Sequence, residues 1–87
     1  MRLTIELLVK LVIGRATGTP PANVLKDHIL ADTHGFSVQG RQTLAFSLTA
    51  KFAENETPIV PPLAPQETEA CVTVRDVMNL IKNRFGV

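Results

Sequence analysis

With 87 residues, the chain has room for one domain, residues 1–87, which buries only about 60% of the surface that the unfolded chain exposes. Hydrophobic residues make up 45% and charged residues 20%, which excludes a disordered chain and predicts an ordinary globular protein. The formal net charge of +1 is too small to favour nucleic acid as a partner, and a single cysteine excludes an internal disulfide.

Apolar residues recur at helical spacing from about residue 3 to residue 16 and predict a first helix, which Gly18 and the prolines after it end. Glu6 and Lys10 interrupt the apolar run, and no cleavage site of small residues follows it. We therefore expect neither an export signal nor a membrane span, and a cytoplasmic protein. The apolar positions are Leu3, Ile5, Leu7, Leu8, Val9, Leu11 and Val12.

Residues 18–36 form a long connection without helical spacing. We expect its apolar side chains to fix it to the core. These are Val24, Leu25, Ile29 and Leu30. A second helix is predicted from Ser37 to Phe52, because Leu44, Leu48 and Phe52 recur every four residues with Ala45 beside them.

Four of the six prolines lie in residues 57–65 and predict an extended, rigid connector, followed by a short helical turn over residues 65–70. Thr73 and Asp76 then have the spacing of a capping box and open the last helix. Its inward side is predicted to be Val74, Val77, Met78, Ile81 and Phe85. The fold class is all-α, a four-helix bundle of three main helices and one short helix.

Three short motifs stand at the helix boundaries: GTPPANV at residues 18–24, GFSVQ at 35–39 and TVRD at 73–76. Together with the order of elements, they resemble the acyl carrier protein family. The family's Gly-x-Asp-Ser-Leu motif falls on residues 35–39, and the match runs without a gap from residue 18 to residue 52. An insertion in the proline-rich segment is then required. The resemblance implies a four-helix bundle with a long loop between its first two helices.

The resemblance also implies that Val38 stands where the family carries the serine that is joined to 4′-phosphopantetheine. Because valine has no hydroxyl, we expect no cofactor and no enzymatic activity, and a role in protein–protein interaction within a biosynthetic or regulatory complex. Ser37, one place earlier, has two interpretations that stay open. It is an N-cap of the helix, or the chain is a working carrier whose 4′-phosphopantetheine is attached to Ser37 and which shuttles acyl thioesters.

The second helix lacks the acidic residues by which the family docks on its enzymes, and has Arg41 and Lys51 instead. Phe46 lies away from the core side by helical angle, and either anchors a partner or folds against the long loop. The expected partner-binding residues are Val38, Gln39, Arg41, Gln42, Phe46 and Thr49. The expected partner of this monomer is a biosynthetic enzyme with a neutral or acidic surface. An unrelated helical module, such as a DNA binder that uses Arg41 and Lys51, remains a third possibility.

Other candidate groups have simpler interpretations. His28 and His34, near Asp27 and Asp32, are expected to be solvated loop residues with no metal between them. Cys71 is expected to pack as a small apolar residue. The sequence shows no pair of carboxylates, nucleophile with a base or glycine-rich phosphate loop, so we expect no catalytic residues.

Overall fold

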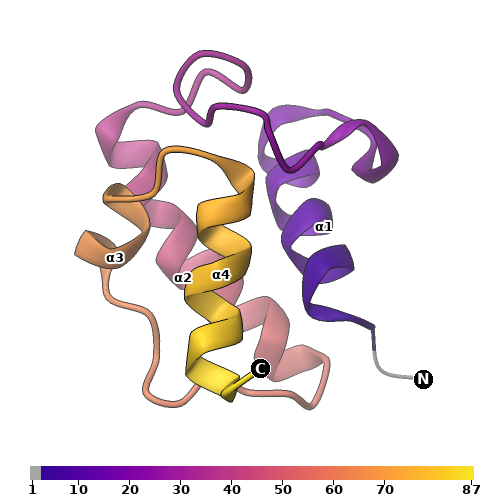
Figure 1. Ribbon diagram of the computed structural model, residues 1–87, viewed down its shortest axis with the longest axis vertical. Coiled ribbons are helices and arrows are strands. Elements are labelled where there is room, and N and C mark those ends of the chain that lie inside the picture. The colour runs from indigo at the N-terminus through magenta and orange to yellow at the C-terminus, as the bar shows by residue number, and fades with distance from the viewer. Residues whose placement is uncertain (1–2) are drawn as a thin grey trace.

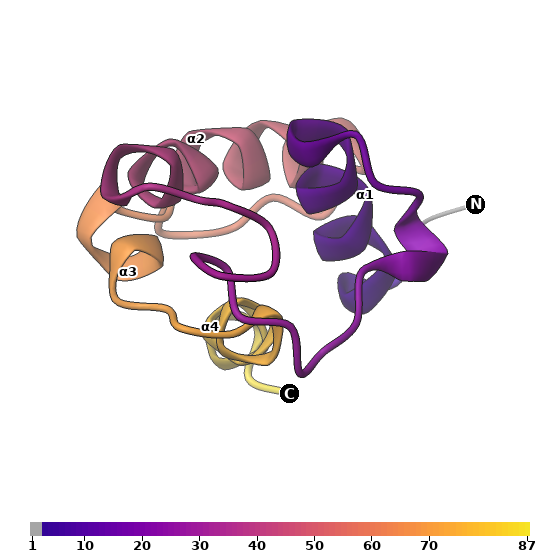
Figure 2. The same ribbon diagram turned by 90° about the horizontal axis from the view of Figure 1, so that it is seen from above.

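The computed structural model describes residues 3–87, which form four α-helices and no β-strand. The helices are α1 (Ile5–Thr17), α2 (Val38–Glu54), α3 (Pro65–Glu69) and α4 (Val74–Phe85), with a single 3₁₀ turn at Pro21–Asn23. The predicted all-α class, with three main helices and one short helix, is confirmed for these residues. In Figures 1 and 2, α1, α2 and α4 surround the centre of the molecule, and α3 lies beside α2.

Side chains at the helix ends explain why the helices start and stop where they do. Thr4 caps α1, since its Oγ1 accepts a hydrogen bond from the Leu7 N–H, and Gly18 ends α1 with a φ of 73°. The capping box predicted for α4 is confirmed. Thr73 Oγ1 accepts from the Asp76 N–H at 3.2 Å, and Asp76 Oδ2 accepts from the Thr73 N–H at 3.0 Å.

The core lies where α1 meets α2 and α4. The predicted inward side of α2 is confirmed, since Leu44, Ala45, Leu48 and Phe52 are all buried. The phenyl ring of Phe52 stacks on that of Phe85, with 6.1 Å between ring centroids, so the ends of α2 and α4 meet through aromatic contact. The other buried apolar residues of the helices are Leu8, Val9, Val12, Ile13, Val74, Val77, Met78 and Ile81.

The first helix begins at Ile5, two residues later than the predicted start at about residue 3, and only part of its apolar run is buried. Leu3 precedes the helix rather than lying in it, and Leu7 lies on the outer side of α1. The inward side of α1 instead includes Ile13, which the sequence pattern did not single out. The spacing predicted the helix but not its buried side, because an apolar run this dense does not distinguish one side of the helix from another.

Four apolar residues were expected to fix the long connection to the core, and for two of them this expectation is wrong. Val24 and Leu30 are fully buried, whereas Leu25 is 52% exposed and Ile29 is exposed as well. The backbone decides which side chains point inward, because the Leu30 N–H donates to the Val72 carbonyl at 2.9 Å. This connection thus lies against the segment between α3 and α4, and alternate residues face solvent.

The proline-rich segment is part of the core and not only a connector. Ile59 and Leu63 are buried, and the Leu63 N–H donates to Thr49 Oγ1 on α2 at 3.3 Å. The prolines keep this segment extended, so that Ile59 and Leu63 reach the core without a helix. The side chain of Arg84 also donates to the Pro61 carbonyl, at 3.1 Å.

Gly14 allows the chain after α1 to turn back tightly against the helix. The Thr19 N–H donates to the Gly14 carbonyl at 2.9 Å, and a Cβ at position 14 would lie only 2.4 Å from the Thr19 carbonyl oxygen. Glycine alone has no Cβ, so it fits here although it is unfavourable in the middle of a helix.

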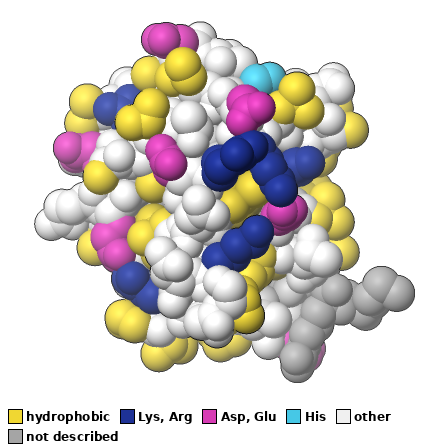
Figure 3. All heavy atoms as spheres, viewed as in Figure 1, with side chains coloured by type: hydrophobic (Ala, Val, Ile, Leu, Met, Phe, Trp, Pro, Cys, Tyr) yellow, Lys and Arg dark blue, Asp and Glu magenta, His cyan; other side chains and the backbone are white. Residues whose placement is uncertain are grey.

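Ion pairs connect the long connection to the helices around it. Glu6 of α1 accepts from Lys26, with 2.6 Å between Nζ and Oε1, and lies 3.6 Å from the Lys82 ammonium of α4. Arg75 pairs with Asp27 at 2.9 Å. In Figure 3, Lys and Arg side chains gather near the middle of the face shown, with acidic side chains beside them. Much of this basic charge is therefore balanced within the molecule.

Candidate functional site at the start of helix α2

Ser37 caps α2, as one of its two interpretations predicted. Its Oγ accepts a hydrogen bond from the Gly40 N–H at 3.0 Å, and its backbone is extended. Gly35, with a φ of 70°, turns the chain into this position. Val38 is the first residue of the helix, and its side chain is 52% exposed. A hydroxyl and an apolar side chain are thus presented side by side at the exposed end of α2.

A small hollow of about 310 Å³ lies beside Ser37. It is bounded by the start of α2 and by the end of α1, where Ala16 contributes to its wall. The other residues that line it are Gly35, Phe36, Ser37, Gly40, Thr43, Leu44 and Ser47. None of these carries a titratable group, so the hollow supplies no base for a nucleophile and offers only hydroxyls and short side chains.

Two of the predicted partner-binding residues hold α2 against α3. Arg41 Nη1 donates to the Phe36 carbonyl at 2.9 Å, and Arg41 Nε donates to the Glu69 carbonyl at 3.2 Å. Gln42 donates through Nε2 to the carboxylate of Glu69. The sequence alone gave no sign of these contacts, because Glu69 lies 27 and 28 residues further along the chain. They fix the orientation of the exposed end of α2.

Thr49 and Gln39 have contrasting positions. Thr49 Oγ1 accepts the hydrogen bond from Leu63 described above, so it is tied to the proline-rich segment. Gln39 is exposed, and its carbonyl accepts from Thr43 Oγ1 at 3.0 Å. Of the six predicted partner-binding residues, Val38, Gln39 and Phe46 are therefore the most accessible, while the other three also serve the fold.

Phe46 is 62% exposed, although it is a large apolar side chain in the middle of a helix. It lies on the same side of α2 as Val38, Gln42 and Thr49, which are eight, four and three residues away, respectively. No acidic residue occurs in α2 before Glu54. The outer side of α2 is therefore apolar at Val38 and Phe46, polar between them, and free of negative charge along most of its length.

The two histidines of the long connection contact each other. His28 Nδ1 lies 3.0 Å from His34 Nε2, and also accepts from the Leu25 N–H at 3.2 Å. One proton lies between the two ring nitrogens, so one imidazole donates and the other accepts. Burial, and secondly the neighbouring His28, lower the pKa of His34. Within residues 3–87, no group of three or more His, Cys, Asp or Glu side chains is placed to hold a metal ion.

Cys71 is buried, as expected for a small apolar residue. Its Sγ donates to the Glu67 carbonyl at 3.4 Å. Burial, followed by the charges of Asp76 and Glu67, raises the pKa of the thiol to about 11. A protonated, shielded thiol is a poor nucleophile, so Cys71 has the properties of a structural residue.

None of the helices in the described part of the chain has both the length and the apolar character needed to cross a lipid bilayer. Comparison of the chain with protein-family models, with curated proteins and with solved structures finds no significant match.

Proposed function

We propose that this chain is a helical bundle of the acyl carrier type that lacks the modified serine and acts by binding another protein through the outer side of α2. The observation that carries the proposal is the exposure of Phe46, at 62%. A phenyl ring in water contributes little to the fold, whereas aromatic side chains are frequent anchors of protein interfaces. Val38 extends the same apolar side toward the start of the helix.

Support for the acyl carrier type comes from the order of the helices and from the start of α2. Ser37 is the residue before the helix and Val38 is its first residue, so the position that the resemblance assigns to the modified serine lies at an accessible helix start. A valine side chain has no oxygen to attack the pyrophosphate of coenzyme A. The proposed function therefore needs no 4′-phosphopantetheine.

The charge of α2 limits the kind of partner. Arg41 and Lys51 are its basic residues, and its one acid, Glu54, is at its last position. We propose a cytoplasmic biosynthetic enzyme or its regulator as the partner, with an apolar recess for Phe46 inside a neutral or acidic surface. The monomer binds it with little rearrangement, since the contacts of Arg41 and Gln42 with Glu69 already orient α2.

A transferase assay tests the alignment at Val38. The protein is incubated with coenzyme A and a broad-specificity phosphopantetheinyl transferase, and its intact mass is measured. The wild type should keep its mass, and Val38→Ser should gain one phosphopantetheine arm. Failure of Val38→Ser to be modified would contradict the position that the resemblance assigns to Val38.

The same assay tests the second candidate function, a working carrier modified at Ser37. Its support is that Ser37 is exposed and borders the small hollow at the helix start. A mass gain in the wild type that Ser37→Ala abolishes would establish this function and overturn the first proposal.

The interface is tested by placing a photo-crosslinking amino acid at position 46, identifying the captured protein and purifying it. The affinity of the purified pair is then measured. Phe46→Ala should weaken binding by about tenfold or more. Leu25→Ala removes another exposed apolar side chain, on the long connection, and should leave the affinity unchanged. Equal effects of the two substitutions would show that Phe46 is no anchor.

A further inference from the structure

A groove of about 630 Å³ separates the last turns of α1 from the second half of α2. Several of its lining residues are short, namely Gly14 and Ala16 of α1 and Ser47 and Ala50 of α2. The connection after α1 closes one side with Thr19 and Pro21, and Leu11 and Val12 provide apolar walls. Its volume lies within the usual range for small-molecule sites.

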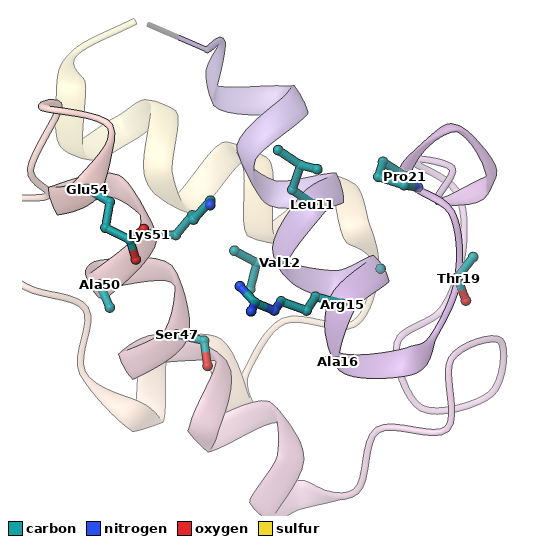
Figure 4. Close-up of a pocket in the computed structure, with 11 residues that line it drawn as sticks. Leu11, Val12, Arg15, Ala16, Thr19, Pro21, Ser47, Ala50, Lys51 and Glu54 are labelled. Carbon is teal, nitrogen blue, oxygen red and sulfur yellow. The ribbon is translucent and has the colours of Figure 1, made fainter.

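Two cations reach into this groove from opposite sides. Figure 4 shows the Arg15 guanidinium extending from α1 toward α2, and the Lys51 ammonium extending from α2 toward α1. Ser47, one turn before Lys51 on α2, also lines the groove and carries a hydroxyl. Within residues 3–87, the side chains of Arg15, Lys51 and Ser47 form no hydrogen bond or ion pair with another residue. Three donors therefore border one space and have no acceptor in the fold.

The carboxylate of Glu54 also borders the groove, but it does not lie between the two cations. Glu54 lies one turn beyond Lys51, at the end of α2, so its carboxylate repels an anion from that end of the groove. The positively charged ends of Arg15 and Lys51 thus face the gap between α1 and α2, away from the Glu54 carboxylate. Two like charges that face one space are stabilised when an anion lies between them, because each then gains a charge-assisted hydrogen bond.

We infer that the groove is a binding site for a small organic anion, a carboxylate, sulfonate or phosphate joined to an apolar body. Arg15, Lys51 and the Ser47 hydroxyl bind the anionic group. The apolar body lies against Leu11, Val12 and Ala50. This inference does not rest on the proposed function, because neither Val38 nor Phe46 lines the groove.

A pair of fluorescent probes tests the inference. 8-Anilinonaphthalene-1-sulfonate carries a sulfonate, and N-phenyl-1-naphthylamine has the same aromatic body without it. The sulfonate probe should bind more tightly than the neutral probe, and its affinity should fall as salt is added. When it binds, the largest changes in the protein's backbone amide NMR shifts should be at Ala16, Ser47 and Lys51.

Charge variants separate the anion site from a general apolar patch. Arg15→Gln combined with Lys51→Gln should weaken binding of the sulfonate probe by about tenfold or more and leave the neutral probe within about twofold. Lys10→Gln combined with Arg75→Gln makes the same change in net charge away from the groove and should change neither probe. The inference would be overturned if both double variants lowered the affinity for the sulfonate probe equally. It would also be overturned if neither double variant changed that affinity.

Steric variants locate the site without changing charge. Ala50→Leu fills the groove and should abolish binding of the sulfonate probe. Ala53→Leu is a matched change on α2 at an exposed residue that does not line the groove, and should leave binding intact. Circular dichroism melting checks that both variants are folded. Unchanged binding by a folded Ala50→Leu variant would contradict the assignment.

Discussion

The Glu67 carboxylate and the Arg84 guanidinium form two parallel hydrogen bonds that join α3 to the last turn of α4. Arg84 Nη1 lies 2.8 Å from Glu67 Oε2, and Arg84 also donates to the Pro61 carbonyl. Glu67 Oε1 accepts in addition from the Ala64 N–H at 3.0 Å. The two side chains are only 28% and 21% exposed, so this pair is partly shielded from solvent. It connects the proline-rich segment, α3 and α4 at one point.

We expect Glu67→Gln to destabilise the protein by about 1–2 kcal/mol, because an amide keeps the shape of the side chain but loses the negative charge and one of the two acceptor oxygens. Urea denaturation at neutral pH measures the free energy of unfolding. Glu54→Gln is the matched control, since Glu54 is exposed at the end of α2 and should change stability little. If both substitutions changed the free energy of unfolding equally, the Glu67–Arg84 pair would make no measurable contribution to stability.

The Glu67–Arg84 pair also predicts how the stability of the protein depends on pH. The Arg84 guanidinium, and secondly the Ala64 N–H, lower the pKa of Glu67 below its ordinary value. A carboxyl group with a lowered pKa stabilises the folded state above its unfolded pKa, about 4.3, and loses that contribution as the pH falls further. The difference in stability between the wild type and Glu67→Gln should therefore shrink below about pH 4. A difference that stays constant down to pH 3 would contradict this assignment.

Gly14→Ala tests the tight return of the chain after α1. In an ordinary helix this change would stabilise by about 1 kcal/mol, but here the new methyl group would meet the Thr19 carbonyl. We expect destabilisation by about 1–3 kcal/mol in thermal or urea unfolding. Gly40→Ala is the control, since its Cβ would meet the Phe36 ring at 3.3 Å, a contact that a small side-chain movement relieves. Stabilisation by both substitutions would show that the close approach at Gly14 is absent.

The contact between His28 and His34 predicts that stability falls in mild acid. Because the pKa of His34 is lowered in the folded state, the unfolded chain binds a proton more readily below about pH 6.5. Stability should decrease as the pH falls from 7.5 to 5. His34→Gln keeps an N–H donor that does not titrate, so its stability should depend less on pH over this interval. NMR titration of His34 in the wild type should give a midpoint below its ordinary value.

The sequence predicted α1, α2 and α4 well because each of them has apolar residues at helical spacing or a cap. Leu44, Leu48 and Phe52 gave the inner side of α2, and Thr73 with Asp76 gave the start of α4. The long connection has no such period. There, the hydrogen bond from Leu30 to Val72 selects the inward side chains, and a partner so distant in sequence leaves no local pattern.

The candidate site was predictable only in part, for the same reason. The cap at Ser37 depends on residues three apart, and helical angle correctly separated Phe46 from the core side. The internal contacts of Arg41 and the open groove beside Lys51 depend on where α3 and α1 lie. Such features follow from tertiary packing, which periodicity along one helix does not specify.

Cys71 should react with thiol reagents only when the protein unfolds. With a pKa raised to about 11 and a buried position, the thiol has almost no reactive thiolate at neutral pH. Labelling with Ellman's reagent should be slow in buffer and complete at once in guanidinium chloride. Fast labelling of the folded protein would show that the segment between α3 and α4 opens readily.

Phe46 and Leu48 lie two residues apart on α2 but should respond differently to truncation. Leu48 is fully buried among the helices, so Leu48→Ala removes core contacts and should cost about 2–5 kcal/mol in the free energy of unfolding. Phe46 is mostly in solvent, so Phe46→Ala should change stability by less than about 0.5 kcal/mol. Urea unfolding of both variants gives the comparison directly. If Phe46→Ala cost as much as Leu48→Ala, the ring would be part of the core, and the outer side of α2 would lose the anchor on which the proposed interface depends.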